Sequence, residues 1–239
     1  VRSLKTRWNK LNSKLVGGIE WGTIMTIAGM SGSGKSSIAN EMETSLFDCN
    51  KHENFSVLSF NFEMLALKQV GRKISSKMSK TVTELYSGHS SLIMAFHVEQ
   101  KKIKGKYYGT VIVLDHTLLT RGGQGASERE ILSRLYGMFM FVKKKIKCIF
   151  IALSQLNREI EKSERLANPM QQYPMKKDIF GSDAVFHGSD YVMVSHKPFM
   201  LHLQTYGPKN LPILNPQDNT QAMIYWHIIK NRDGESGLV

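Results

Sequence analysis

A glycine-rich octapeptide, Gly29-Met-Ser-Gly-Ser-Gly-Lys-Ser36, has the spacing of a phosphate-binding loop. It fits the pattern G-x-x-x-x-G-K-[ST] and lies between an apolar segment and a helix-forming segment, which is the context that this pattern requires. Glycines let backbone amides curl around phosphate oxygens, and the positive end of the helix dipole points at the same anion. The residues that we expect around nucleotide phosphates are Gly29, Met30, Ser31, Gly32, Ser33, Gly34, Lys35, Ser36 and Ser37.

Three side chains have the chemistry to hold the phosphates of ATP and a Mg²⁺ ion. Lys35 has the position of the lysine that reaches the β- and γ-phosphates in such loops. The Ser36 hydroxyl is a hard oxygen ligand of the kind that Mg²⁺ prefers. The run Val111-Ile-Val-Leu-Asp115 is an apolar strand that ends in a carboxylate, the Walker B arrangement, so Asp115 is a second candidate ligand for the metal.

Hydrolysis also needs a group that orients the attacking water, and Glu63 has suitable chemistry. It follows a β-rich segment, and ligands collect beyond the carboxyl ends of strands in α/β sheets. The alternative is that Glu63 caps a helix or lies in its first turn, where a carboxylate is also favourable. Its position in the sequence leaves both interpretations open.

These candidate residues must be positioned by strands and helices that alternate along the chain. Short apolar runs bounded by glycine, charged or polar residues are typical of buried parallel strands. Such runs cover residues 23–28, 56–62, 110–115 and 148–154, with further candidates at 190–195 and 225–229. Stretches of helical composition cover residues 36–47, 66–78 and 128–145. The alternation predicts an α/β fold with a mostly parallel central β-sheet flanked by helices.

The connection formed by residues 197–221 has a different texture, with four prolines and several Asn, Gln and Gly residues. This composition predicts either a long surface loop or a short β-excursion of modest order.

The chain of 239 residues has a formal net charge of +12. A basic face concentrates polyanions, so the charge favours an acidic partner such as nucleic acid, although a merely soluble basic protein is the alternative. The two cysteines, Cys49 and Cys148, lack the spacing of a zinc site or a redox pair, which favours a reducing, cytoplasmic setting. No stretch approaches the roughly 20 apolar residues of a membrane span, so we expect no membrane partner.

Several motifs, in order along nearly the whole chain, resemble the RecA-like motor domain of DnaB-type replicative helicases. Leu153-Ser-Gln-Leu-Asn-Arg158 is the most specific of them. The others are Trp8 to Leu11, Gly17-Gly-Ile-Glu-Trp-Gly22, Asn61-Phe-Glu-Met64 with Arg72, Glu128-Arg-Glu-Ile-Leu-Ser-Arg-Leu135 and Lys230-Asn-Arg-Asp-Gly-Glu-Ser-Gly237. The resemblance implies a RecA-like P-loop NTPase fold, with residues 1–22 as an opening segment, residues 23–239 as the ATPase domain, and the family's N-terminal domain absent.

The same resemblance assigns roles and partners. It makes Glu63 the catalytic base and Gln155 the sensor of the γ-phosphate, and it makes Lys230 and Arg232 a finger inserted into the ATP site of a neighbouring subunit. Two residues at i and i+2 on a strand project on one face, although such a pair alone would also suit a solvated basic edge. The implied partners are single-stranded DNA, like chains in a hexameric ring, a primase and a helicase loader.

The sequence departs from the family where DNA is expected to bind. In the segment that matches the family's Asp-Leu-Arg-Glu-Ser-Gly loop, Phe180 and Gly181 stand where Arg and Glu are expected, and Asp183 replaces Gly. Phe180 could stack on a base while Lys176 and Lys177 meet phosphates, or Phe180 could be a packing residue. A second candidate DNA-binding loop is the basic, glycine-rich Arg121-Gly-Gly-Gln-Gly125.

The expected function is therefore an ATP-dependent replicative DNA helicase motor that couples hydrolysis to translocation on single-stranded DNA and duplex unwinding. The alternative is a RecA- or KaiC-like ATPase that assembles on DNA or acts as a switch without unwinding. A third interpretation, a non-enzymatic nucleotide-binding subunit, is disfavoured because five functional residue types occur together, namely Lys35, Ser36, Glu63, Asp115 and Gln155.

Overall fold

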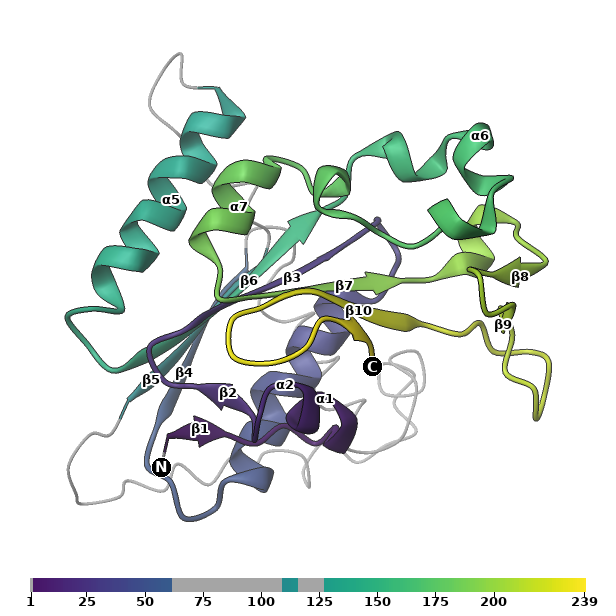
Figure 1. The fold of residues 1–239 in the computed structure, drawn as a ribbon. Coiled ribbons are helices and arrows are strands. Elements are labelled where there is room, and N and C mark those ends of the chain that lie inside the picture. The colour runs from purple at the N-terminus through teal and green to yellow at the C-terminus, as the bar shows by residue number, and fades with distance from the viewer. Residues whose placement is uncertain (1, 62–108, 116–126) are drawn as a thin grey trace, which may run out of the picture.

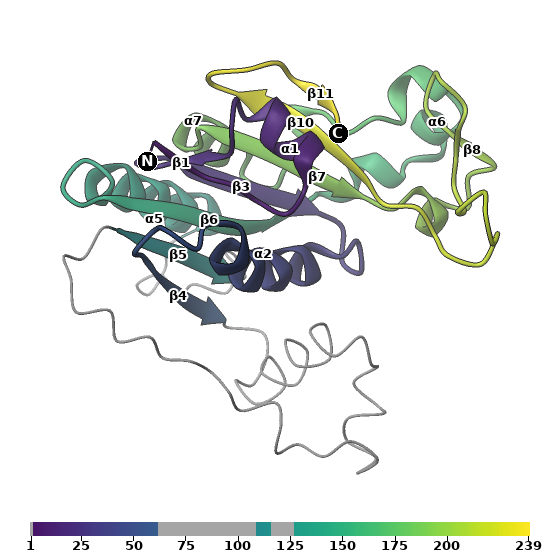
Figure 2. The same cartoon turned by 90° about the horizontal axis from the view of Figure 1, so that it is seen from below.

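The computed structural model describes residues 2–61, 109–115 and 127–239. Within these ranges, a seven-stranded β-sheet has the strand order β11-β10-β7-β3-β6-β5-β4, which Figure 2 shows from one edge to the other. The strands are β3 (Ile24–Gly29), β4 (Ser56–Asn61), β5 (Thr110–Asp115), β6 (Cys148–Gln155), β7 (Tyr191–His196), β10 (Tyr225–Asn231) and β11 (Gly237–Leu238). The first five are parallel to one another, whereas β10 is antiparallel to both β7 and β11. The mostly parallel sheet predicted from the apolar runs is thus confirmed.

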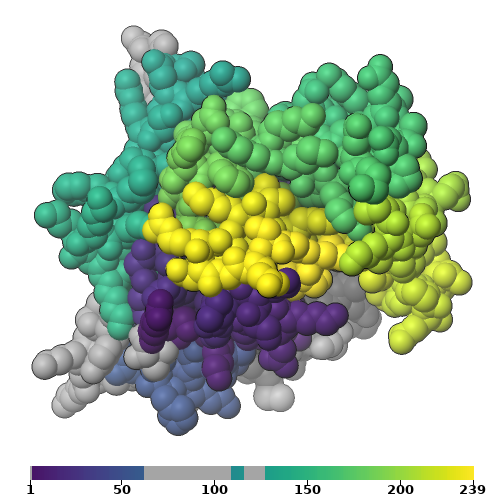
Figure 3. All heavy atoms as spheres, in the orientation of Figure 1, coloured from purple at the N-terminus to yellow at the C-terminus, as the bar shows by residue number. Residues whose placement is uncertain are grey.

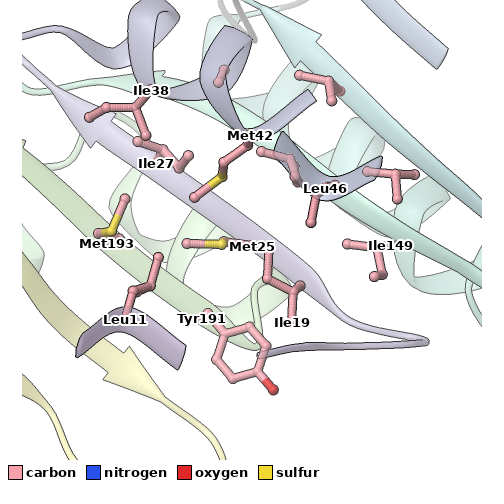
Figure 4. Close-up of a cluster of buried hydrophobic side chains, with 14 of the residues drawn as sticks. Leu11, Ile19, Met25, Ile27, Ile38, Met42, Leu46, Ile149, Tyr191 and Met193 are labelled. Carbon is pink, nitrogen blue, oxygen red and sulfur yellow. The ribbon is translucent and has the colours of Figure 1, made fainter. Parts of the chain in front are cut away.

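One face of the sheet is covered by helix α2 (Lys35–Cys49). Its residues Ile38, Met42 and Leu46 pack in one buried cluster with Met25 and Ile27 of β3 (Figure 4). Because β3 lies near the middle of the sheet and all six of its residues are buried, this cluster fixes where α2 begins and therefore where the glycine-rich loop lies.

The opposite face is covered by α5 (Glu128–Val142) and α7 (Ser182–Gly188) (Figure 1). Ser127 caps α5: its hydroxyl accepts from Glu130 N, and the Glu130 carboxylate accepts from Ser127 N. A second buried cluster includes Tyr136 of α5 and Val185 of α7, which pack with Ile24 of β3. Tyr136 also hydrogen-bonds through its hydroxyl to the Thr26 hydroxyl, at 2.7 Å.

The N-terminal segment adds a small layer beside α2. It consists of β1 (Ser3–Leu4), α1 (Asn9–Lys14) and β2 (Ile19–Glu20), and β1 pairs with β2 in antiparallel fashion. Leu11 and Ile19 belong to the same buried cluster as Met25. The C-terminal strands lie directly above this segment in Figure 3, and Asn231 Nδ2 donates to the Lys14 carbonyl oxygen at 2.8 Å.

The remaining elements are short and lie in two segments. Between β6 and α7 are η3 (Arg158–Glu161), α6 (Ser163–Leu166), η4 (Pro169–Gln171) and η5 (Lys176–Asp178). Between β7 and β10 are η6 (Pro198–Leu201) and the antiparallel strands β8 (Thr205–Tyr206) and β9 (Leu211–Pro212), so this connection contains the short β-excursion.

The predicted helices fit the structure as far as it extends. The helix predicted for 36–47 is α2, and the one predicted for 128–145 ends at Val142, because Lys143 turns away to pair with Asp190. The helix predicted for residues 66–78 lies outside the described ranges. None of the helices in those ranges is long and apolar enough to cross a membrane.

Candidate active site

The glycine-rich loop joins the end of β3 to the start of α2, so it lies at the carboxyl edge of the parallel strands. A Cβ atom on Gly29 would lie 2.3 Å from Ser33 Oγ and 2.6 Å from the Ser195 carbonyl oxygen, which leaves no room for a side chain. Gly32 and Gly34 have φ values of 77° and 88°, in the left-handed region that glycine adopts at little cost. The backbone of the loop therefore requires the glycines of the sequence pattern.

Hydrogen bonds fix this loop to the strands on both sides of β3. Ser195 Oγ of β7 donates to the Ser33 carbonyl oxygen at 2.7 Å. On the other side, Leu156 N, just after β6, donates to the Gly29 carbonyl oxygen at 3.2 Å. Both neighbouring strands therefore hold the loop in place.

Lys35 is buried within the loop, with only 7% of its surface exposed. Its Nζ donates to the carbonyl oxygens of Gly29 and Met30, at 2.8 and 2.7 Å. An ammonium group is thus held where an anion entering the loop can meet it.

The strand register brings the other predicted residues to the same edge. Gln155 pairs in register with Gly29, and Asp115 pairs with Asn61 at the end of β4. Asn61 Nδ2 donates to Asp115 Oδ2 at 3.3 Å, and Asp115 is 5% exposed. Ser36 lies in the first turn of α2 and is partly exposed. Glu63, two residues after Asn61, lies outside the described ranges.

The residues at this edge have the composition that a magnesium nucleotide requires. The buried hydroxyls of Ser33 and Ser154 have no hydrogen-bond partner within the described ranges. Such groups are uncommon in folded proteins and often meet a ligand or water. Ser36 and Asp115 add the hydroxyl and carboxylate oxygens that suit Mg²⁺. The donors present therefore fit the ion and its phosphates.

Ser195 and Asn61 are parts of this edge that the sequence patterns do not single out. Each is a polar residue at or near the end of a strand, which is the signal that could have indicated them. Ser195 is fully buried, yet its contact with Ser33 joins residues 162 positions apart. Only the pairing of β7 with β3 reveals this contact.

Lys230 and Arg232 lie at the opposite edge of the sheet. Asn231, between them, pairs with Tyr191 at the start of β7, and Tyr191 pairs with Met25 near the start of β3. The glycine-rich loop follows the other end of β3, so the length of that strand, roughly 15–20 Å at about 3.3 Å per residue, separates the two groups. Neither side chain can reach the loop of its own chain.

A buried carboxylate holds the Arg232 guanidinium at that edge. Asp190 is 1% exposed, pairs with both Arg232 and Lys143, and accepts from Ile24 N at 2.8 Å. The Arg232 side chain nevertheless remains 60% exposed. Its orientation is therefore set by the centre of the sheet while much of the guanidinium faces outward.

Lys230 is directed toward α7. Its Nζ donates to the Phe186 carbonyl oxygen and lies 5.2 Å from the centre of the Phe186 ring. Burial, reinforced by the positive charge of Arg232, lowers the pKa of Lys230. The two side chains thus contact different partners, both next to α7, in this single chain.

The predicted DNA-binding residues 176–180 border a cleft of about 360 Å³ beside the first turns of α5 and α7. Lys177 and Arg129 bring two positive charges to its lining. Phe180 also lines the cleft, but it is partly buried and packs against the core cluster under α5 and α7. Its structural surroundings therefore favour the packing interpretation. Arg121 lies outside the described ranges.

Two of the departures from the family loop have physical consequences here. A Cβ atom on Gly181 would lie 2.4 Å from Leu132 Cδ1, and Gly181 has a φ of 62°, so glycine fits where the family has Glu. Asp183 forms an ion pair with Lys176 at 3.0 Å, and this hydrogen bond lowers the pKa of Asp183. Lys177 is accordingly the lysine of this loop that we expect to meet phosphate most directly.

A buried aromatic cluster supports the segment beside the glycine-rich loop. His196 follows Ser195, is fully buried and stacks on Tyr206 with ring centres 5.1 Å apart. Neither of its ring nitrogens has a hydrogen-bond partner within the described ranges. Burial, with a smaller contribution from the Arg165 charge, lowers the pKa of His196 to about 4, against a weaker opposing effect of Asp178.

We expect acid to destabilise the fold through this histidine. An unfolded histidine binds its proton near pH 6.5, so the stabilising contribution of neutral His196 is complete above that pH and is lost as pH falls toward 4. The loss is on the order of 3 kcal/mol. In denaturant unfolding across this pH range, His196→Phe should flatten the decline, whereas His52→Phe, at an exposed position, should leave it unchanged. Parallel pH profiles for wild type and His196→Phe would disprove this assignment.

The sheet order, the loop after β3 and the helices on both faces define a RecA-like ATPase fold. Three solved structures share it. One titled as an ATPase domain has a TM-score of 0.75 and 17% identity over 99% of this chain and 86% of its own. A DnaB-like replicative helicase, described with its interactions with primase, has a TM-score of 0.76 and 17% identity over 100% and 60%. A KaiC-like protein from the archaeon Pyrococcus horikoshii OT3 has a TM-score of 0.52 and 15% identity over 100% and 91%.

Residues 88–239 match the family described as the DnaB-like helicase C-terminal domain. The chain belongs to this family. Among curated proteins, none matches the sequence. The chain spans 60% of the length of the DnaB-like replicative helicase to which its fold is similar.

Proposed function

We propose that this protein hydrolyses ATP with Mg²⁺ and uses the energy to move along single-stranded DNA and unwind duplex DNA, as the motor of a replicative helicase. The observation that carries the proposal is the loop between β3 and α2, whose glycines and buried Lys35 are arranged to hold phosphates. Family membership supplies the helicase context. The work of such a protein belongs in the cytoplasm, where replicating bacterial or phage DNA is found.

In this proposal the residues at the carboxyl edge divide the work. The amides of residues 29–37 and the Lys35 ammonium bind the phosphates, while Ser36 and Asp115 hold Mg²⁺, which would neutralise phosphate charge. Asn61 orients the Asp115 carboxylate through the hydrogen bond between them. Gln155, in register with Gly29, senses the γ-phosphate, and Glu63 positions and deprotonates water.

The opposite edges of the sheet suggest how copies of the chain cooperate. Arg232 and Lys230 cannot serve the loop of their own chain, so we propose that they complete the site of an adjacent subunit in a hexameric ring. A primase and a helicase loader are the proposed further partners. Support for the primase is the DnaB-like replicative helicase of similar fold, whose structure is described with primase interactions.

Lys35→Ala tests the nucleotide site itself. Hydrogen bonds to charged groups contribute about 1.5–3 kcal/mol, so ATP affinity should fall by about 10- to 100-fold in calorimetric titrations. The thermal unfolding midpoint should stay close to that of wild type, which separates loss of binding from loss of fold. As a matched control, Lys209→Ala changes an exposed lysine on the turn between β8 and β9 and should bind ATP normally. Unchanged ATP affinity in Lys35→Ala would remove the basis of the proposal.

Binding of single-stranded DNA should be independent of sequence and should weaken steeply as salt increases, because lysine contacts release counterions from phosphates. For Lys176→Ala/Lys177→Ala, the slope of log affinity against log salt should become shallower by about 0.7 for each phosphate that no longer meets a lysine. Because Lys176 is paired with Asp183, Lys177→Ala alone should produce most of the change. Fluorescence anisotropy with Lys209→Ala as control measures these slopes, and a flat salt dependence in wild type would contradict the proposed interface.

Phe180 separates the two interpretations of that loop. If the ring stacks on a base, Phe180→Ala should weaken binding at all salt concentrations by about 1–3 kcal/mol. If it only packs against the cluster under α5 and α7, the same variant should lower the unfolding free energy, and Phe180→Leu should restore both stability and binding.

A further inference from the structure

Apolar side chains from the connection between β7 and β10 lie against the glycine-rich loop. A Cβ atom on Gly32 would lie 3.2 Å from Met200 Cε, and one on Gly34 would lie 3.3 Å from Ile224 Cδ1. Met200 belongs to η6, shortly after β7, and Ile224 immediately precedes β10. Two segments from opposite ends of one long connection therefore converge on the phosphate-binding loop.

These side chains form a partly exposed apolar surface. Met200 is 36% exposed, Ile224 is 41% exposed and the neighbouring Phe199 is 47% exposed. Exposed apolar residues are ordinary when they occur singly, but here Met200 and Ile224 both adjoin one loop. On the α2 side of the loop, the accessible residues of the first turns are the polar Ser37 and Asn40. The loop thus has one polar flank and one apolar flank.

The apolar flank is held by the sheet. Tyr225, next to Ile224, pairs in register with His196 at the end of β7. In η6, Met200 N donates to the Lys197 carbonyl oxygen at 3.1 Å, and Pro198 is buried. The bond from Ser195 Oγ to the Ser33 carbonyl then ties β7 to the loop. Such preformed apolar surfaces next to a few polar groups are typical of small-molecule sites.

We propose that Met200 and Ile224 form the surface on which the purine base of the nucleotide packs while its phosphates occupy the glycine-rich loop. The inference rests on the proposed ATPase function and adds to it the site of the base. A base has flat, weakly polar faces, which gain dispersion and burial energy against apolar side chains. Because these contacts read no hydrogen-bonding group, the surface increases affinity for purine nucleotides without separating adenine strongly from guanine.

Calorimetric titration of the full chain with Mg²⁺-ADP and with Mg²⁺-pyrophosphate tests the inference, because only ADP carries a base. Met200→Ala/Ile224→Ala should weaken ADP binding by about tenfold and leave pyrophosphate binding within about twofold of wild type. Met200→Leu/Ile224→Leu, which keeps an apolar surface, should bind both ligands as wild type does. Met138→Ala removes a 52% exposed methionine from α5 and serves as the matched control.

Three outcomes would overturn the inference. An equal loss of ADP and pyrophosphate binding would show that Met200 and Ile224 act by shaping the loop. Unchanged binding of both ligands would show that the base lies elsewhere. If wild type binds neither ADP nor pyrophosphate, the proposed ATPase function fails first and the base surface fails with it, so the two failures are distinguishable.

Discussion

Arg232→Ala should lower ATP turnover of the assembled protein by about 10³–10⁵-fold, the usual contribution of arginine fingers that stabilise the charge of phosphoryl transfer. The structure supports a role in a neighbouring site because Arg232 lies at the edge of the sheet opposite the glycine-rich loop. Turnover should therefore rise more than linearly with protein concentration, since a monomer lacks a complete site. Steady-state hydrolysis across a dilution series measures both effects.

The environment of Arg232 allows its catalytic role to be separated from a role in folding. In Arg232→Ala, Asp190 keeps its ion pair with Lys143 and its hydrogen bond from Ile24 N, so the buried carboxylate stays compensated. The unfolding free energy should consequently change little. Arg232→Lys keeps the charge but loses the forked geometry and should recover only part of the activity. Arg134→Ala, at an exposed position on α5, is the matched control.

Mixing two inactive variants determines whether Arg232 acts between subunits. An Arg232→Ala chain keeps its own Lys35 and Glu63, whereas a Glu63→Gln chain keeps its own Arg232. Mixed rings should contain some interfaces with both functional halves, so activity should reappear on mixing. If mixed oligomers verified by mass remain inactive, Arg232 acts within its own chain or only in folding, and the proposed ring mechanism loses its main support.

Glu63→Gln should slow ATP hydrolysis by about 10²–10⁴-fold while ATP affinity stays close to that of wild type, because a positioned general base contributes this much to rate and little to binding. The amide keeps the size and much of the polarity of the carboxylate, so it cannot act as base but still fits. Glu63 follows β4, whose last residue, Asn61, hydrogen-bonds to Asp115 at the carboxyl edge.

Single-turnover hydrolysis and calorimetric ATP binding together measure this difference. Glu128→Gln, at an exposed position in the first turn of α5, controls for loss of a carboxylate. A change of less than twofold in the hydrolysis rate of Glu63→Gln would assign Glu63 to the helix-capping role that its sequence position also allows.

The parts of the fold that could be predicted are those whose cause is local. β3, β6 and β7 are buried on both faces by helices, so each is a nearly continuous apolar run that the sequence displays directly. The glycine-rich loop was equally visible, because steric limits at Gly29 and positive φ angles at Gly32 and Gly34 leave few other residues possible.

The remaining features depend on contacts between distant parts of the chain. The bond from Ser195 to Ser33 and the bond from Ile24 N to Asp190 join residues 162 and 166 positions apart, and no pattern encodes such pairs. Gly181 could be noted as a departure from the family, but its reason, the close approach of Leu132, lies in the packing of α5 on α7. The apolar flank at Met200 likewise exists only because a proline-containing connection folds back onto the loop.

The most direct test of the proposed motor is strand separation measured on a forked DNA substrate while ATP turnover is followed in the same reaction. We expect single-stranded DNA to stimulate turnover and the fork to open only with hydrolysable ATP, and we expect Lys35→Ala and Glu63→Gln to show neither activity. A protein that hydrolyses ATP in response to DNA without displacing a strand would contradict the helicase account and favour an ATPase that assembles on DNA or acts as a switch.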